Sequence, residues 1–193
     1  MLTSLHIELA ARYDATHVWL ANSGHPYTKC PGCGKFMSPS GACQHCNFVE
    51  DDDRMIARGK KAMERASTGK LRTVKDAMYR KGLGTIDFDL GWPPKGEQKV
   101  HGSGVLKLLD KHHDDMPAIP ETIVKGKVVT AFSRETGKPD PQRIYIIRNP
   151  FIATLRKSGE KRWSLTSHYR NGSQAKAFED RARDLHSPQT KGR

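Results

Sequence analysis

The only four cysteines of the chain lie within 17 residues of each other, as two Cys-x-x-Cys pairs. Cys30 and Cys33 form the first pair, and Cys43 and Cys46 form the second. In each pair the two thiolates converge on one side of a tight turn, and glycines around the first pair allow the backbone this turn requires. Four such thiolates suit tetrahedral zinc at about 2.3 Å per bond and leave no open position for water. We therefore expect one structural zinc ion here.

Two alternatives to a four-cysteine zinc site follow from the same segment. His45 or His25 could replace one cysteine as a ligand, although the pairing of the cysteines favours the thiolates. An unmetallated redox pair is the other alternative, but a redox Cys-x-x-Cys normally stands alone at the start of a helix. The spacing does not reveal the purpose of the site, because such ribbons bind nucleic acid, bind proteins or brace a neighbouring domain.

The formal net charge of +12 is concentrated in two separate blocks of the 193-residue chain. Residues 54–82 carry 10 basic and 2 acidic side chains, and residues 134–193 carry 14 and 6. Two basic blocks around a near-neutral centre suit a polyanion that crosses the surface. Two solvated faces are the alternative on charge alone. Attraction to a membrane is less favoured, because the basic segments lack apolar faces rich in Trp, Phe and Leu.

The apolar residues predict a cytoplasmic protein. They make up only 36% of the chain, and no run of them approaches the ~18 residues of a membrane span. The N-terminus lacks the basic region and apolar stretch of a secretory signal.

Helices are expected where apolar residues recur at helical spacing. The acidic residues 51–53 favour a helix over 54–65, because carboxylates are stabilised at the positive end of a helix dipole. We expect a second short helix over 71–79, ended by the glycines that follow. Other expected helices cover residues 2–12, 103–112, 120–124 and 173–185, and residues 187–193 are expected to be disordered.

Strands are expected where β-branched and aromatic residues cluster or alternate. Residues 85–90 alternate, which places Asp87 and Asp89 on the wet face of a strand. Further strands are predicted over 127–133, 143–148, 151–157 and 162–166, and their short links favour an antiparallel meander. The predicted fold class is α+β, with a zinc ribbon (1–50), a basic helical segment (51–82), an α+β domain (83–172) and a basic tail (173–193).

Four motifs in this order resemble the barnase/EndoU/colicin/RelE-like endoribonuclease domains of phages, toxins and mobile elements. They are Gly-Thr-Ile-Asp-Phe-Asp-Leu-Gly-Trp from Gly84, Gly-Ser-Gly-Val-Leu-Lys-Leu-Leu-Asp-Lys-His from Gly102, Ile-Pro-Glu-Thr-Ile-Val-Lys-Gly from Ile119, and Trp-Ser-Leu-Thr from Trp163. The likeness covers roughly residues 60–170 and not the ribbon. It implies helices packed on an antiparallel sheet, an RNA substrate, a host-cytoplasm location if phage-encoded, and an inhibitor, immunity or host protein as partner.

The resemblance also implies metal-independent RNA cleavage, in which the 2′-hydroxyl attacks the adjacent phosphate and leaves a 2′,3′-cyclic phosphate. Such a reaction needs a base, an acid and donors to the charged phosphorane. Lys107 and Lys111 lie four apart on one helix face, and His112 ends the same helix with a pKa range suited to proton transfer. Thr166 can donate to a phosphate oxygen. Many members carry a histidine where this chain has Lys107, so the base is His112, His101 or Lys107 with a depressed pKa.

The remaining basic candidates are expected to hold phosphates: Arg148, Arg156, Lys157, Arg162, Lys75 and Arg80. Each chemical assignment has a structural alternative. His112 and His113 can simply end a helix at its negative pole, and Trp163 is more typical of a core than of base stacking. Two non-enzymatic functions also stay open, a nucleic-acid-binding module without catalysis and a protein whose ribbon docks onto a host machine.

Overall fold

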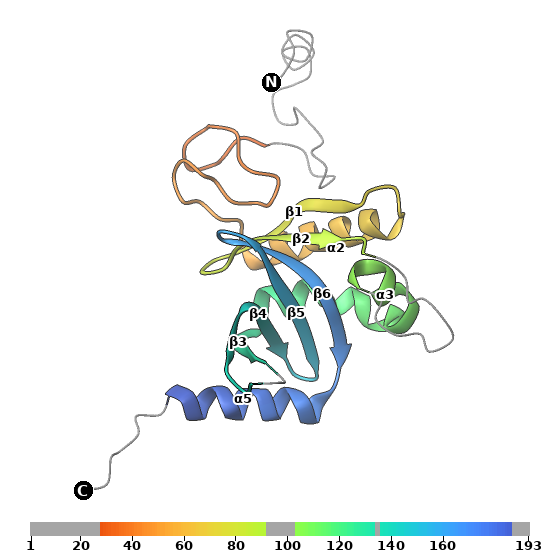
Figure 1. Cartoon of the computed structure of the whole chain (residues 1–193). Coiled ribbons are helices and arrows are strands. Elements are labelled where there is room, and N and C mark those ends of the chain that lie inside the picture. Colours follow the sequence, from red (N-terminus) through yellow and green to blue (C-terminus); the bar gives the residue numbers. More distant parts are fainter. Residues whose placement is uncertain (1–27, 92–102, 134–135, 187–193) are drawn as a thin grey trace, which may run out of the picture.

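The computed structural model of the chain describes residues 28–91, 103–133 and 136–186, and combines one six-stranded sheet with helices on both faces (Figure 1). In chain order the elements are α2 (Asp52–Ser67), β1 (Thr73–Arg80), β2 (Gly84–Asp89), α3 (Gly104–Lys111), the 3₁₀ helix η1 (His113–Ala118), α4 (Ile119–Lys125), β3 (Lys127–Phe132), β4 (Pro139–Arg148), β5 (Phe151–Gly159), β6 (Arg162–Arg170) and α5 (Gly172–His186). The α+β class is thus confirmed.

The sheet joins a hairpin to a meander, and its strand order is β1-β2-β6-β5-β4-β3. Strands β3 to β6 form the antiparallel meander predicted from the short links between them. The expectation of a purely antiparallel sheet is wrong, because β2 runs parallel to β6. This pairing covers only the first residues of β6, from Arg162 to Leu165. Among the described residues no strand pairs with the rest of β6 on that side, and α3 packs against β6.

The helix predicted over residues 71–79 is wrong, since this segment forms β1. Val74, Ala77 and Met78 are buried at positions i, i+3 and i+4, the spacing of a helix face. In the structure this spacing comes from a β-bulge between Val74 and Met78, where Asp76 has a positive φ of 54°. The bulge resets the alternation of the strand, so that Ala77 and Met78 are both buried.

Helix α2 confirms the helix predicted over residues 54–65 and extends it by a few residues at each end. The Asp51 carboxylate caps its N-terminus by accepting a hydrogen bond from the backbone N–H of Arg54 at 2.9 Å. Its apolar stripe is fully buried against the sheet and α4. The basic segment therefore shares one core with the rest of the domain, and the predicted boundary between residues 82 and 83 lies within the β1–β2 turn.

Two hydrophobic clusters lie on opposite faces of the sheet. The larger one packs α2, α3 and α4 against one face, which we call the inner face, with Phe88, Ile123 and Leu165 at full burial. The smaller one packs α5 against the opposite, outer face, where Tyr145 stacks on Phe178 with ring centroids 4.6 Å apart. Helix α5 packs mainly on β3, β4 and β5, and Tyr169 of β6 also packs against this outer cluster.

Most other predicted elements agree with the structure to within a few residues. Helices α3, α4 and α5 match the ranges 103–112, 120–124 and 173–185, while β5 and β6 run further than expected. The predictions for residues 2–12 and 187–193 lie outside the described residues. Within the described part of the chain, no helix combines the length and apolar character needed to cross a membrane.

Gly59 marks the closest approach of α2 to its neighbours, which gives a test of this packing. A Cβ atom here would lie 2.8 Å from Cβ of Pro120 and 2.6 Å from Sδ of Met78. We expect Gly59→Leu to lower the free energy of unfolding by about 1–3 kcal/mol through overpacking. The measurement is urea unfolding beside Lys61→Leu, which adds the same side chain at an exposed position of α2. Equal stability of the two variants would contradict the packing.

Candidate metal site and candidate nucleic-acid interface

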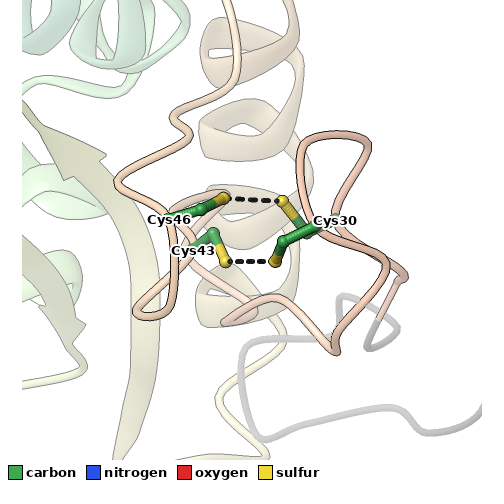
Figure 2. A group of neighbouring side chains, drawn as sticks. Cys30, Cys43 and Cys46 are labelled. Atoms are coloured by element: carbon green, nitrogen blue, oxygen red, sulfur yellow. Dashed lines mark hydrogen bonds between the residues drawn. The ribbon is translucent and has the colours of Figure 1, made fainter.

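The four cysteines converge as the sequence predicts. Their sulfur atoms all lie within 4.8 Å of one another, with 3.5 Å between Cys30 and Cys46 and 3.6 Å between Cys33 and Cys43. Figure 2 shows Cys30 and Cys46 facing each other from two loops, with Cys43 in the same group. All four are free thiols and not disulfides. This cluster can hold a metal ion, and we call residues 28–50 the cysteine module.

Two equivalent turns build the cluster. The backbone N–H of Cys30 donates to the carbonyl of Lys35, and that of Cys43 donates to the carbonyl of Phe48, both at 2.7 Å. The residue after each pair has a positive φ, 71° at Gly34 and 59° at Asn47. Asparagine tolerates this left-handed backbone better than most residues. The sequence analysis missed Asn47, although its place after the second pair matches that of Gly34.

Backbone donors and neighbouring thiols shift the cysteine pKa values in opposite directions. The N–H of His45, 3.4 Å from Sγ of Cys43, is the main cause that lowers the pKa of Cys43 to about 7. At Cys46 the N–H of Phe48 also lowers the pKa, but Cys30 and the other two thiols raise it to about 12. Four thiolates so close together require a cation to neutralise them, which is what a metal ion supplies.

One ion pair attaches the cysteine module to α2. Arg58 donates to both carboxylate oxygens of Glu50, at 2.9 and 2.8 Å, and also to the carbonyl of Pro39. The two charged side chains are only 10% and 12% exposed. The module, orange in Figure 1, therefore has a fixed position next to the β1–β2 hairpin.

A second group of polar side chains lies in rows across the outer face of the sheet. The strand register places Tyr145, Thr154 and Ser167 opposite one another on β4, β5 and β6. The next row toward the cysteine module contains Arg143, Arg156 and Ser164 in the same order. Arg143, Ser167 and Tyr169 were not among the predicted candidates. For Ser167 and Tyr169 the reason is a bulge in β6 between Leu165 and Ser167, which breaks the simple alternation.

Lys107 of α3 and His112, the residue that follows the last turn of α3, contact side chains of β6 on this face. Nζ of Lys107 donates to Oγ of Ser167 at 3.4 Å. The ring of His112 lies against Tyr169, with ring centroids 6.4 Å apart. The structure therefore brings together two of the predicted catalytic residues, with Lys111 nearby on the same helix.

Burial and neighbouring lysine charges lower the pKa of both groups, which favours their neutral forms. Partial burial is the main cause that lowers the pKa of Lys107, and the charge of Lys111 adds to it. Burial likewise lowers the pKa of His112, helped by Lys107 and opposed by Asp115. His112 is therefore neutral near pH 7, and Lys107 loses its proton more readily than an exposed lysine.

Arg143 and Arg156 form a like-charge pair directly across two strands, an arrangement that destabilises a sheet. Both are exposed. Arg143 has only a long ion pair of 3.8 Å with Asp140, and Arg156 has no ion-pair partner among the described residues. A bound anion between them would relieve this repulsion.

Two other predicted binding residues, Arg80 and Arg148, and the predicted catalytic residue Thr166 are engaged inside the protein. Arg80 donates to the carbonyls of Ile123 and Gly126 at the end of α4, and burial lowers its pKa. Arg148 pairs with Glu121 at 2.8 Å. The hydroxyl of Thr166 donates to the carbonyl of Thr154 at 3.1 Å, within the bulge of β6.

The remaining candidates fall into three groups. Lys75 and Lys157 are exposed, as expected of surface cations. His25 and His101 lie outside the described residues. Trp163 packs against the main core, and its indole N–H donates to the carbonyl of Leu83 at 3.2 Å, which agrees with the structural alternative.

The environments of Asp87 and Arg162 differ most from those predicted from the sequence. Asp87 is not on a wet face but only 5% exposed, and its carboxylate accepts from Nε of Arg162 at 2.7 Å. Arg162 also donates to Asp76 at 2.8 Å, and the hydrogen bond with Asp87 is the main cause that raises its pKa. This ion-pair network ties β1, β2 and β6 together.

His168 is a buried histidine that the sequence analysis did not single out. It is fully buried on the inner side of β6, where Nε2 lies 3.3 Å from the hydroxyl of Thr122, and Nδ1 has no hydrogen-bond partner among the residues that the structure describes. Burial is the main cause that lowers its pKa to about 4. His168 is therefore a neutral part of the core.

Comparisons of this chain with known protein families, with curated proteins and with solved structures found no match. The site is therefore interpreted from its own geometry.

The depressed pKa of His168 makes stability depend on pH in a definite direction. Unfolding lets this histidine bind a proton below pH 6.5, whereas the folded protein resists protonation down to about pH 4. The contribution of His168 to the free energy of unfolding is therefore fully present above pH 6.5, and it decreases as the pH is lowered toward 4. We expect a loss of about 2 kcal/mol between pH 7.5 and pH 5.

The measurement is urea unfolding at the two pH values for the wild-type protein and His168→Gln. The variant is expected to lose less stability on acidification, and His113→Gln at an exposed position serves as the control. Identical pH dependence of the wild type and His168→Gln would contradict the assignment.

Proposed function

We propose that this chain is an endoribonuclease that cleaves RNA by 2′-hydroxyl attack, without a metal ion in the bond-making step. The observation that carries the proposal is the placement of Lys107 at Ser167 and of His112 at Tyr169, two residues apart on β6, with the pKa of both groups lowered. The like-charge pair of Arg143 and Arg156 lies on the same face and favours a phosphate-bearing ligand. The resemblance to phage and toxin ribonuclease domains adds support for RNA.

The residues supply each part of the reaction. Neutral His112 takes the proton of the 2′-hydroxyl, whose oxygen forms a bond to phosphorus. Lys107, oriented by Ser167, stabilises the phosphorane charge and gives its proton to the departing 5′-oxygen. The P–O5′ bond breaks, leaving a 2′,3′-cyclic phosphate and a 5′-hydroxyl. Arg143 and Arg156 bind flanking phosphates of the same strand.

A binding module without catalysis is the second candidate function. It is favoured by one observation, the unbalanced positive charge of the Arg143–Arg156 row, which binds phosphates whether or not a proton is transferred. In that case arginine substitutions weaken affinity and its salt dependence, while changes at His112 have no effect.

The ion proposed for the cysteine module is zinc, in a structural role. Four cysteine thiolates form a set of soft sulfur donors, and two Cys-x-x-Cys turns present them in the arrangement of a structural zinc site. The four protein ligands fill a tetrahedron and leave no position for a substrate. The metal then fixes the loops that contact α2 and the sheet.

Catalysis is tested with His112→Ala and Lys107→Met. General acid–base groups contribute about 10²–10⁴-fold to rates, so each variant is expected to cleave labelled RNA at least ~100-fold more slowly. Because the pKa of His112 is lowered, wild-type activity should persist below pH 6.5 before it declines. The measurements are single-turnover cleavage rates over a range of pH values and the affinity for an uncleavable RNA.

His113→Ala changes an exposed histidine next to the site and serves as the matched control. It is expected to cleave at the wild-type rate. A wild-type rate for His112→Ala, with RNA binding retained by all variants, would support the binding module and contradict the enzyme.

The metal is tested by elemental analysis of the purified protein. We expect one zinc per chain, and loss of zinc together with lower thermal stability in Cys43→Ser, because structural zinc contributes directly to folding. His45→Ala is the control, since the structure gives its backbone N–H and not its ring a role at the cluster. Zinc loss in His45→Ala alone would overturn the four-cysteine ligand set.

A further inference from the structure

A cleft between the cysteine module and the outer face of the sheet has no role in the chemistry above. Its volume is about 380 Å³, and it is lined by residues of both parts. Phe36, Gln44 and His45 come from the module, while Asp76, Thr85 and Arg162 come from the sheet. The two parts are held together by the Arg58–Glu50 ion pair, so the walls of the cleft have fixed positions.

One wall of the cleft carries an aromatic ring that faces solvent. Phe36 is 50% exposed, more than any other large hydrophobic side chain in the described part of the chain. Its backbone is fixed by an antiparallel bridge to Lys29 in the first cysteine turn. An exposed, rigidly mounted aromatic ring is a platform on which a nucleobase can stack.

The opposite wall carries a carboxylate on a strained backbone. Asp76 has φ of 54°, a left-handed conformation that is uncommon for a residue other than glycine and is maintained here by its surroundings. Its N–H donates to Asp87 at 2.8 Å, and one of its carboxylate oxygens accepts from Arg162 at 2.8 Å. The side chain stays 32% exposed. Bulges of this kind often reorient a side chain beside a functional site.

The charges in the cleft favour a base over a phosphate. Asp76 and Arg162 line the cleft, and Asp87, which is only 5% exposed and does not line it, also pairs with Arg162, so this ion-pair group has a net charge of −1. A phosphate is repelled by that charge, whereas the amino group on the edge of a nucleobase donates to a carboxylate. Gln44 adds an exposed amide that can both donate and accept.

We propose that this cleft binds one unpaired nucleobase of single-stranded RNA, stacked on Phe36 with its amino edge directed at Asp76. The inference rests on the proposed function, because the same RNA strand is expected to reach Lys107 and His112. Arg162 and Ser167 lie five residues apart on β6, about 16 Å at 3.3 Å per residue. The cleft and the reacting phosphate are therefore separated by a few nucleotides of an extended strand.

The test measures affinity for a short RNA whose scissile 2′-hydroxyl is replaced by hydrogen, so that binding is observed without cleavage. The full-length, zinc-loaded protein is used, with zinc content checked for every variant. Stacking of one base on an aromatic ring corresponds to roughly 5- to 150-fold in affinity. We expect Phe36→Ala to weaken binding by about tenfold and Phe36→Trp to restore it.

Two further comparisons assign the loss to a base. Removing the base at one nucleotide of the RNA should weaken wild-type binding by about as much as Phe36→Ala, and the two changes should not add. Asp76→Asn removes the charge while keeping a residue that tolerates positive φ, and should weaken binding to an amino-bearing base more than to uracil. Val128→Ala, at the other exposed large hydrophobic residue, is the matched control.

The outcomes separate the inference from the proposed function. Equal affinity of Phe36→Ala and Val128→Ala for the RNA, with wild-type binding intact, would overturn the base-binding cleft alone. Additive losses from Phe36→Ala and every abasic position would also overturn it. Absence of RNA binding by the wild-type protein would overturn the proposed function itself.

Discussion

The short parallel pairing of β2 with β6 is the constraint on which the rest of this structure depends. It joins the β1–β2 hairpin to the β3–β6 meander and is reinforced by Arg162, which bonds Asp87 and Asp76 across three strands. A partly buried ion pair of this kind specifies an arrangement more than it stabilises one. Because the pairing stops at Leu165, no strand in the described part of the chain pairs with the later residues of β6 on this side. Helix α3 packs against β6, with Lys107 at Ser167 and His112 at Tyr169.

The same network links the two candidate binding regions. Arg162 lies at the start of β6, where it lines the cleft beside the cysteine module, and Ser167 lies five residues further along the same strand. The module itself is fixed from the other side by Arg58 of α2, whose guanidinium reaches Glu50 and the carbonyl of Pro39. A metal ion in the four-cysteine cluster would thus order loops that form one wall of the cleft. The basic helix α2 serves as a structural support, with its apolar stripe in the core.

Local patterns predicted most elements, and the errors occurred where distant residues decide the outcome. The cysteine spacing predicted the cluster, and short links predicted the meander. The helix expected over residues 71–79 was wrong because a bulge at Asp76 buries Val74, Ala77 and Met78 at helical spacing.

The environment of Asp87 could not be predicted from its neighbours in the sequence. It was expected on a wet face, because its partner, Arg162, lies 75 residues away in the sequence. Ser167 and Tyr169 were missed because the bulge before Ser167 is invisible in the sequence. Lys107 and His112 were singled out because both fall in the helix predicted over residues 103–112.

The most direct test of the central claim is the chemistry of the RNA ends. End-labelled transfer and ribosomal RNA would be incubated with the zinc-loaded protein in buffer free of magnesium, and the termini of any fragments identified. Discrete fragments with 2′,3′-cyclic phosphate and 5′-hydroxyl ends are the predicted result, because the attacking group is the neighbouring 2′-hydroxyl. Intact RNA, or fragments with 5′-phosphate ends, would contradict the account.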